Sequence, residues 1–292
     1  MKDNYTKDWI ISNAVEICSR YEKGILTLRA LHYQLVAIGM TNDVQHYKRV
    51  VTAMISARWS RIISFDTFSD LDRAMVGETK ASPTNLDEGV EAAKDAIGAW
   101  MKYYFKNRWE NQPIYPEVLI EKKALQGVFD RTCSSLGVGM GACKGYPSLT
   151  FLHEAYLRYK EQVDEGKEVV IIYFGDYDPS GEDIPRAIEE NLSRMGVDVR
   201  IERIGLNEEQ VLKWNLPPAP AKDTDTRTAA FNLRGGLGQV ELDAVKPEVL
   251  RSLCKDAILN EFDTDLYDQL KKVEDEEAVE YRKQVKEFVN NL

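Results

Sequence analysis

The chain has 292 residues, 43% of them hydrophobic and 29% charged, and its formal net charge is −10. This composition indicates a packed globular protein rather than a disordered one, and no apolar run approaches the roughly 20 residues of a membrane-spanning helix. The overall acidity argues against a general polyanion-binding protein. Four scattered cysteines without a Cys-x-x-Cys pair, and a charged N-terminus without a signal-peptide core, lead us to expect a protein of the reducing cytoplasm.

The first 80 residues are predicted to form a helical domain. Apolar residues at helical spacing predict helices over 7–22, 27–38 and 43–58, and a short β-like stretch, RIISFDTF, follows them. Three helices and a β element in this order suit a winged-helix module, although such modules are often purely structural.

Charge makes this N-terminal region the part of the chain best suited to nucleic acid. Residues 1–80 contain 11 basic against 9 acidic residues, whereas residues 254–292 contain 6 against 11. The candidate groove-facing residues are Arg49, Arg58 and Arg61. A solvated helix face would show the same pattern, so the charge permits DNA binding without demonstrating it.

Beyond residue 80 the pattern changes twice. Residues 81–112 combine a polar linker with an amphipathic connecting helix. Residues 113–255 alternate strand and helix patterns, which is the signature of a mainly parallel sheet flanked by helices, so the fold class is α/β. Residues 256–292 read as an acidic, amphipathic helical tail.

Two strands of the α/β region end in carboxylates. Glu121 ends the strand pattern IYPEVLIE, and Asp176 and Asp178 follow the apolar run EVVIIYFG. Because the carboxyl ends of parallel strands share an edge of the sheet, the three side chains can converge there. Three hard oxygen ligands suit Mg²⁺, for which Mn²⁺ can substitute. The alternative is a solvated turn in which Asp178 or Ser180 caps the next helix and Glu121 pairs with Lys122 or Lys123.

These motifs resemble a known family. The strand-end glutamate followed by Asp-x-Asp-x-x-Gly (Asp176, Asp178, Gly181) is similar to the Toprim pattern of topoisomerases, primases and certain nucleases. The ordered stretches IEKKAL, KGYPSL, FGDYDPSGEDI, LPPAPAK and VELDAV resemble the topoisomerase VI A subunit and its small bacterial and phage relatives. The resemblance covers roughly residues 20–255 and implies a winged-helix domain followed by a Toprim domain, with Mg²⁺ at Glu121, Asp176 and Asp178.

The same resemblance gives meaning to TLRALHYQL. In the topoisomerase VI A subunit and the meiotic double-strand-break transesterase, a tyrosine of an Arg-x-x-x-Tyr element attacks a DNA phosphate, and Arg29 and Tyr33 match it. Four residues apart, they share one helix face, so the guanidinium could hold the phosphate that the phenol attacks. The alternative for Tyr33 is a core residue, and His32 is either a base or a packing residue. Tyr21 and Tyr47 are alternative nucleophiles.

The resemblance implies a homodimer that cleaves double-stranded DNA by tyrosine transesterification, with each active site shared between protomers. The sequence carries no ATP-binding motif, and topoisomerases of the family obtain ATPase activity from a separate partner subunit. The alternatives are a Toprim endonuclease that hydrolyses DNA with metal-activated water and a noncatalytic DNA-binding subunit. Lys222, in LPPAPAK, matches a family motif and is either a phosphate contact or a surface lysine.

Overall fold

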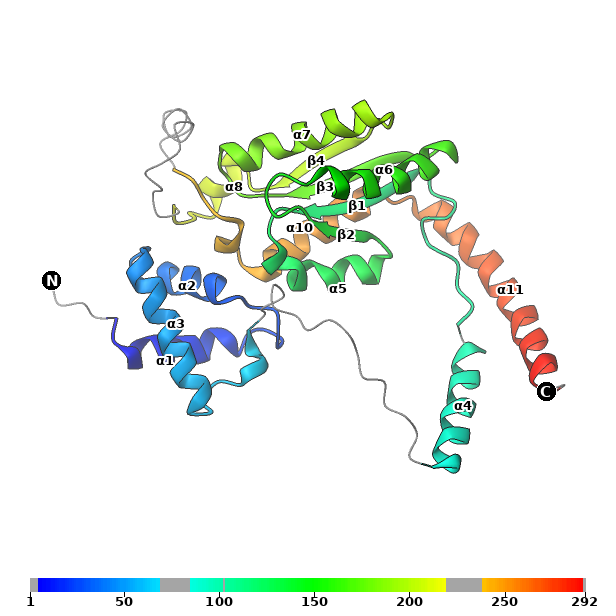
Figure 1. Cartoon of the computed structure of the whole chain (residues 1–292), viewed down its shortest axis with the longest axis horizontal. Coiled ribbons are helices and arrows are strands. Elements are labelled where there is room, and N and C mark those ends of the chain that lie inside the picture. Colours follow the sequence, from blue (N-terminus) through cyan, green and yellow to red (C-terminus); the bar gives the residue numbers. More distant parts are fainter. Residues whose placement is uncertain (1–4, 69–84, 102, 219–237, 291–292) are drawn as a thin grey trace. The chain divides into compact units, whose positions relative to one another are not determined.

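The computed structural model describes residues 5–68, 85–101, 103–218 and 238–290, which belong to two compact units (Figure 1). The first unit comprises Met1–Arg73 and Ile114–Glu261, and the second Ala74–Pro113 and Phe262–Leu292. Within the described ranges, no helix is both long enough and apolar enough to cross a membrane.

Three helices open the first unit, close to where the sequence predicts them. They are α1 (Lys7–Cys18), α2 (Leu28–Ala37) and α3 (Val44–Trp59). Each starts at a residue whose side chain accepts a hydrogen bond from a main-chain N–H of the first turn, as helix-capping residues do: Thr6, Thr27 and Asp43. Their apolar faces form one core, in which Leu31, Leu35 and Met54 are fully buried.

The β-like stretch expected after α3 does not form a strand. Arg61 turns the chain with a φ of 56°, and Phe65–Thr67 form a 3₁₀ turn, η1. Between residues 5 and 68, the β pairing is a single parallel bridge from Leu26 to Phe68. The apolar residues of this stretch serve packing instead, because Ile63 is buried in the helical core while Ile62 is exposed.

The remainder of the first unit is an α/β fold around a four-stranded, all-parallel sheet in the order β2-β1-β3-β4, which confirms the predicted fold class. Its strands are β1 (Ile114–Ile120), β2 (Gly139–Ala142), β3 (Glu168–Phe174) and β4 (Arg200–Gly205). Its helices and 3₁₀ turns are η3 (Lys123–Leu125), α5 (Gln126–Leu136), α6 (Leu149–Asp164), α7 (Pro179–Met195), α8 (Glu208–Lys213), η4 (Leu242–Ala244) and α10 (Pro247–Asn260).

Helices cover both faces of this sheet, with α6 and α7 on one side and α5 and α10 on the other (Figure 1). The sequence of strand β3 requires cover on both faces. Every residue after Glu168 is buried, and successive side chains of a strand point to opposite faces. Ile171 belongs to the core formed with α6 and α7, whereas Phe174 contacts Phe129 of α5 at a ring-centroid distance of 4.8 Å. With both faces covered, polar chemistry is confined to an edge of the sheet.

The second unit contains α4 (Leu86–Trp100) and α11 (Thr264–Asn290). Gln112 and Asp263 exchange two hydrogen bonds, from Gln112 Nε2 to the Asp263 carbonyl at 2.9 Å and from the Asp263 N–H to Gln112 Oε1 at 2.8 Å. Trp109 packs on Phe262, with ring centroids 5.1 Å apart. These contacts join the segment before β1 to the beginning of the tail.

Candidate active site

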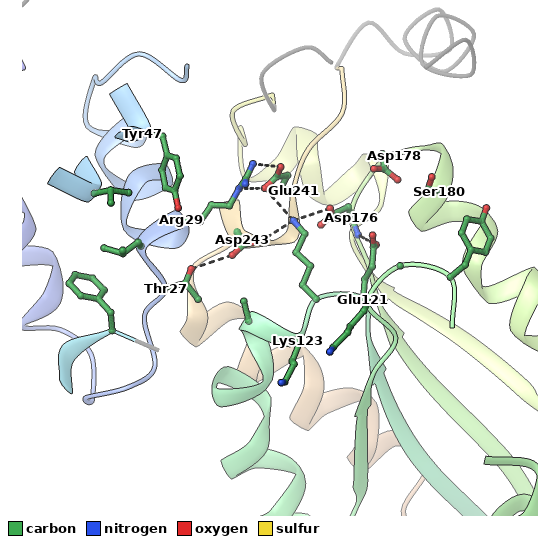
Figure 2. A pocket seen from close by; sticks show the side chains of 18 of the residues that line it. Thr27, Arg29, Tyr47, Glu121, Lys123, Asp176, Asp178, Ser180, Glu241 and Asp243 are labelled. Carbon is green, nitrogen blue, oxygen red and sulfur yellow. Dashed lines mark hydrogen bonds and ion pairs between the residues drawn. The ribbon is translucent and has the colours of Figure 1, made fainter. Parts of the chain in front are cut away.

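The three predicted carboxylates lie at the carboxyl edge of the two central strands. Glu121 follows β1 and Asp176 follows β3, and these strands pair directly up to Ile120 and Phe174. The Asp176 N–H donates to Glu121 Oε2 at 2.9 Å, so two of the carboxylate residues are in contact across the strand pair. Figure 2 shows Glu121, Asp176 and Asp178 together at this edge.

Asp178 has a structural task as well. It is the N-cap of α7, and its Oδ1 accepts from the Gly181 N–H at 2.7 Å. Gly181 allows this turn to pass close to the strand end, since a Cβ there would lie 2.2 Å from the Asp176 carbonyl oxygen. The helix-cap interpretation of Asp178 is therefore correct, and it is compatible with a metal because only one carboxylate oxygen makes the cap.

Two of the carboxyl groups at this edge have raised pKa values, chiefly because burial disfavours their charged forms. Burial raises the pKa of Asp176 to about 7, with Lys122 opposing the shift and Glu121 adding to it. Burial also raises the pKa of Glu121; the Asp176 amide opposes that shift and the Asp178 charge adds to it. Repulsion among buried carboxylates favours either a proton or a cation between them.

Lys122 is the cation that already lies there, and the sequence prediction mentioned it only as a partner of Glu121. Its Nζ is 2.9 Å from Asp176 Oδ2, 3.2 Å from Glu241 Oε2 and 3.0 Å from Asp243 Oδ2. Burial alone would lower the pKa of Lys122, but the three carboxylates more than offset it and raise that pKa. The ammonium group is thus charged and shared among them.

Glu241 and Asp243 were missed as individual site residues, although VELDAV was singled out as a motif. Glu241 directly precedes η4 and Asp243 lies within it. This turn is held at the site because the Leu242 N–H donates to Asp176 Oδ1 at 2.8 Å and Val240 bridges to Tyr177. The signal that could have identified them is their spacing, which repeats the two-apart acidic pair of Asp176 and Asp178.

The helical domain contributes residues from the start of α2 to the site. Arg29 Nη2 donates to Glu241 Oε1 at 2.5 Å, and its Nε forms a second contact with Oε2. Thr27 Oγ1 donates to Asp243 Oδ1 at 3.3 Å while it also caps α2. The Arg29 guanidinium lies 5.9 Å from the centroid of the Tyr47 ring, within cation–π range.

These residues border one cavity of about 1000 Å³ (Figure 2). Glu121, Asp176 and Asp178 line it from the sheet, and Arg29 and Tyr47 line it from the helical domain. Three further basic residues stand on its wall: Arg58, Lys123 and Lys144. A cavity lined by both carboxylates and basic side chains suits a metal together with an anionic ligand.

Tyr33 lies elsewhere. It is 2% exposed and lines a separate cavity of about 270 Å³, together with Trp214, Leu216 and Val245. Burial and the Glu241 charge raise the pKa of its phenol above the ordinary value, while Arg29 opposes the shift. His32 is also buried, its pKa is lowered chiefly by that burial, and its ring lies 5.6 Å from that of Tyr47.

The predicted DNA-binding residues are dispersed. Arg58 lines the large cavity, and its guanidinium lies 5.6 Å from the centroid of the Phe68 ring. Arg49 lines a different surface pocket beside Lys48, and Arg61 is exposed at the turn after α3. Lys222 lies outside the described residues.

The donor chemistry of this edge fits a hard divalent cation, because it offers the carboxylate oxygens of Glu121 and Asp176, whose pKa values are raised chiefly by burial. Across residues 5–68, 85–101, 103–218 and 238–290, no three Asp, Glu, His or Cys side chains are gathered tightly enough to enclose an ion as they stand. Lys122 and the Leu242 amide hold the Asp176 oxygens in the conformation shown.

Comparison with known proteins returned nothing: no family model matches the chain, and no curated protein or solved structure is similar to it. The chemistry of the site therefore has to be argued from its residues.

Proposed function

We propose that this chain cleaves the phosphodiester backbone of double-stranded DNA in a Mg²⁺-dependent reaction at the large cavity. One observation carries the proposal: Glu121, Asp176 and Asp178 border the same cavity as Arg29. Metal-dependent phosphoryl transfer needs carboxylates for the ion and a cation for the phosphate within reach of one another. The resemblance to Toprim proteins supports DNA as the substrate.

The roles follow from the chemistry of each side chain. Glu121, Asp176 and Asp178 hold the ion, which when bound polarises the phosphate and stabilises the departing oxygen. Arg29 donates its planar fork to the phosphate oxygens, a geometry for which guanidinium groups are well suited. Lys144, exposed on the cavity wall, contacts the neighbouring backbone phosphates.

The first form of the reaction is transesterification by Tyr33. Its phenolate oxygen attacks phosphorus, an Oη–P bond forms, the P–O3′ bond breaks, and the 3′ oxygen leaves with a proton, so that a 5′-phosphotyrosyl link results. Because the raised pKa of Tyr33 disfavours the phenolate, a base has to take the phenolic proton. The family resemblance supports a homodimer in which Tyr33 of one protomer serves the carboxylates of the other, with a separate ATPase as a further partner.

The second form is hydrolysis, in which water replaces the tyrosine. A specific observation favours it: Tyr33 is 2% exposed and lines another cavity than the carboxylates of its own chain. In this form Tyr33 is a core residue, while Glu121, Asp176, Asp178 and Arg29 keep their roles. The products would then carry free ends and no protein.

The test is cleavage of supercoiled plasmid and end-labelled duplex DNA with Mg²⁺ or Mn²⁺, quenched with detergent. Label that enters a gel only after protease digestion, and is lost in Tyr33→Phe and Asp176→Asn, supports transesterification. Protein-free cleavage that survives Tyr33→Phe but not Asp176→Asn supports hydrolysis. No cleavage by the wild-type protein with either metal contradicts cleavage by this chain alone.

A further inference from the structure

We infer that Arg29 and Lys122 form a phosphodiester subsite, and that the carboxylate of Glu241 occupies it in the absence of DNA as a stand-in for the phosphate. The inference rests on the proposed function, since it names the part of the cavity that receives the DNA backbone. It goes beyond that proposal by assigning Lys122 to the subsite and by giving Glu241 a role that opposes DNA binding.

The contacts of Glu241 are those of a bound oxyanion. Its two oxygens accept from the Arg29 fork, with Nη2 at 2.5 Å from Oε1 and Nε in contact with Oε2, and Lys122 Nζ lies 3.2 Å from Oε2. A phosphodiester also presents two equivalent oxygens that share one negative charge. Arginine and lysine donors recognise carboxylate and phosphate by the same hydrogen bonds.

Glu241 is ionised in this position. Burial alone would raise its pKa, but Lys122 and Arg29 more than offset the burial and lower it. Figure 2 shows the Glu241 carboxylate in direct contact with the Arg29 guanidinium, with Asp176 on its other side. The stand-in is therefore a full negative charge placed between the helical domain and the candidate metal ligands.

The pair is accessible to an incoming ligand. The Arg29 side chain keeps 44% of its surface exposed, while that of Glu241 keeps 12%. Arg29 lines the cavity, and the Glu241 carboxylate occupies the guanidinium donors that a phosphate would need.

The backbone around Glu241 does not depend on its side chain. Val240 and Tyr177 exchange main-chain hydrogen bonds of 2.8 and 3.0 Å, and the Leu242 N–H donates to Asp176. DNA can thus displace the Glu241 carboxylate from Arg29 and Lys122 while η4 stays attached to the sheet edge. Lys122 also contacts Asp176, so the phosphate would enter beside the ion that Asp176 is proposed to hold.

The test is the affinity of the full-length protein for a labelled duplex, measured by fluorescence anisotropy in EDTA so that cleavage does not intervene. Glu241→Gln keeps the shape of the side chain but removes its charge, and we expect roughly ten-fold tighter binding because the competing anion is gone. Glu190→Gln is the matched control, since it removes the same charge from an exposed pair with Arg186 on α7. We expect it to change affinity less than about two-fold.

A double-mutant cycle locates the effect. In an Arg29→Gln background the gain from Glu241→Gln should shrink, because one of the two donors that it uncovers is absent and only Lys122 remains. A gain in the wild-type background equal to that of Glu190→Gln, or one that is undiminished without Arg29, contradicts the stand-in. Should Glu241→Gln fail to fold, Asp243→Asn makes the same test, since it removes another carboxylate charge from Lys122 and keeps an acceptor for Thr27.

The outcomes separate the two proposals. If the wild-type protein binds DNA and Glu241→Gln binds it no better, the stand-in is wrong and the proposed function is untouched. If neither protein binds duplex DNA in EDTA, the stand-in is wrong, and the Mg²⁺-dependent cleavage assay decides the proposed function separately.

Discussion

Lys122 and Asp176, which come from different strand ends, form an ion pair with Nζ and Oδ2 2.9 Å apart. Asp176 is also a candidate metal ligand, so the chain neutralises with its own lysine a carboxylate that would otherwise be buried alone. The pKa of Asp176 is nevertheless raised to about 7, because burial and the neighbouring Glu121 outweigh the lysine. Metal binding thus requires the charged form of Asp176, whereas burial makes that form unfavourable for stability.

Asp176→Asn is expected to make the protein more stable and less active. Between the ordinary aspartate pKa of about 4 and the raised value, the native state holds more protons than the unfolded state, so wild-type stability falls as pH rises through that window. The substitution removes this loss, and we expect a gain of about 1–2 kcal/mol at pH 8 but little at pH 4. Asparagine can still accept from the Leu242 N–H.

Urea denaturation at pH 4, 6 and 8 measures the stability, and DNA cleavage with Mg²⁺ measures the function. Wild-type cleavage should rise with pH through about 7, since the metal needs ionised carboxylates. Equal stability of the wild type and Asp176→Asn at pH 8 would show that the carboxylate is not destabilising when charged.

Asp178 allows helix capping and metal binding to be separated. Asparagine can cap α7 through the Gly181 N–H as aspartate does, so Asp178→Asn should change stability by only a few tenths of a kcal/mol. Asp178→Ala loses the cap as well and should cost about 1 kcal/mol. Both should reduce Mg²⁺-dependent cleavage by roughly ten-fold or more. If Asp178→Asn cleaves like the wild type, Asp178 only caps the helix.

The sheet and its acidic edge could be predicted because short stretches of sequence determine them. The continuous apolar run before Asp176 is typical of a strand covered on both faces, and β3 has that burial. Parallel pairing then brings Glu121 beside Asp176 without further information. The prediction for the stretch after α3 was wrong because it also relied on a local pattern. Its isoleucines and phenylalanines favour a strand, but Ile63 packs into a helical core and no neighbouring strand is described for it.

The resemblance pointed to Arg29, but the contacts of the basic residues of the site could not be predicted from local patterns. Arg29 meets Glu241, 212 residues away, and Lys122 meets Asp243, 121 residues away. No periodicity encodes such pairs. Tyr33 was ambiguous because α2 is buried on more than one side, at Leu31, Tyr33 and Leu35 among others, so its pattern does not distinguish a core tyrosine from one that faces a ligand.

Gly181→Ala is expected to disturb the carboxylates through backbone crowding. The added Cβ would lie 2.2 Å from the Asp176 carbonyl oxygen, so the turn has to shift, at a cost of about 1–3 kcal/mol. DNA cleavage should fall together with stability, because Gly181 contacts both Asp176 and Asp178 and a shift of the turn would move them. Gly98→Ala is the control: in α4 a Cβ meets nothing within 4 Å, and alanine favours helix. Thermal melts and cleavage assays of both variants check the difference, and a Gly181→Ala protein with wild-type stability would contradict the close approach.

Tyr33→Phe decides whether a protein–DNA link forms at this tyrosine. If Tyr33 is the nucleophile, the variant should lose all covalent adduct while it still binds DNA, because Arg29 and the carboxylates remain. Its stability should change by less than about 1 kcal/mol, since the substitution removes one hydroxyl and keeps the buried ring. Tyr21→Phe, which removes a hydroxyl bonded to Gln34 at 3.1 Å in the same helical domain, should keep the adduct. Adduct that survives Tyr33→Phe but is lost in Tyr47→Phe would assign the nucleophile to the tyrosine that lines the large cavity beside Arg29.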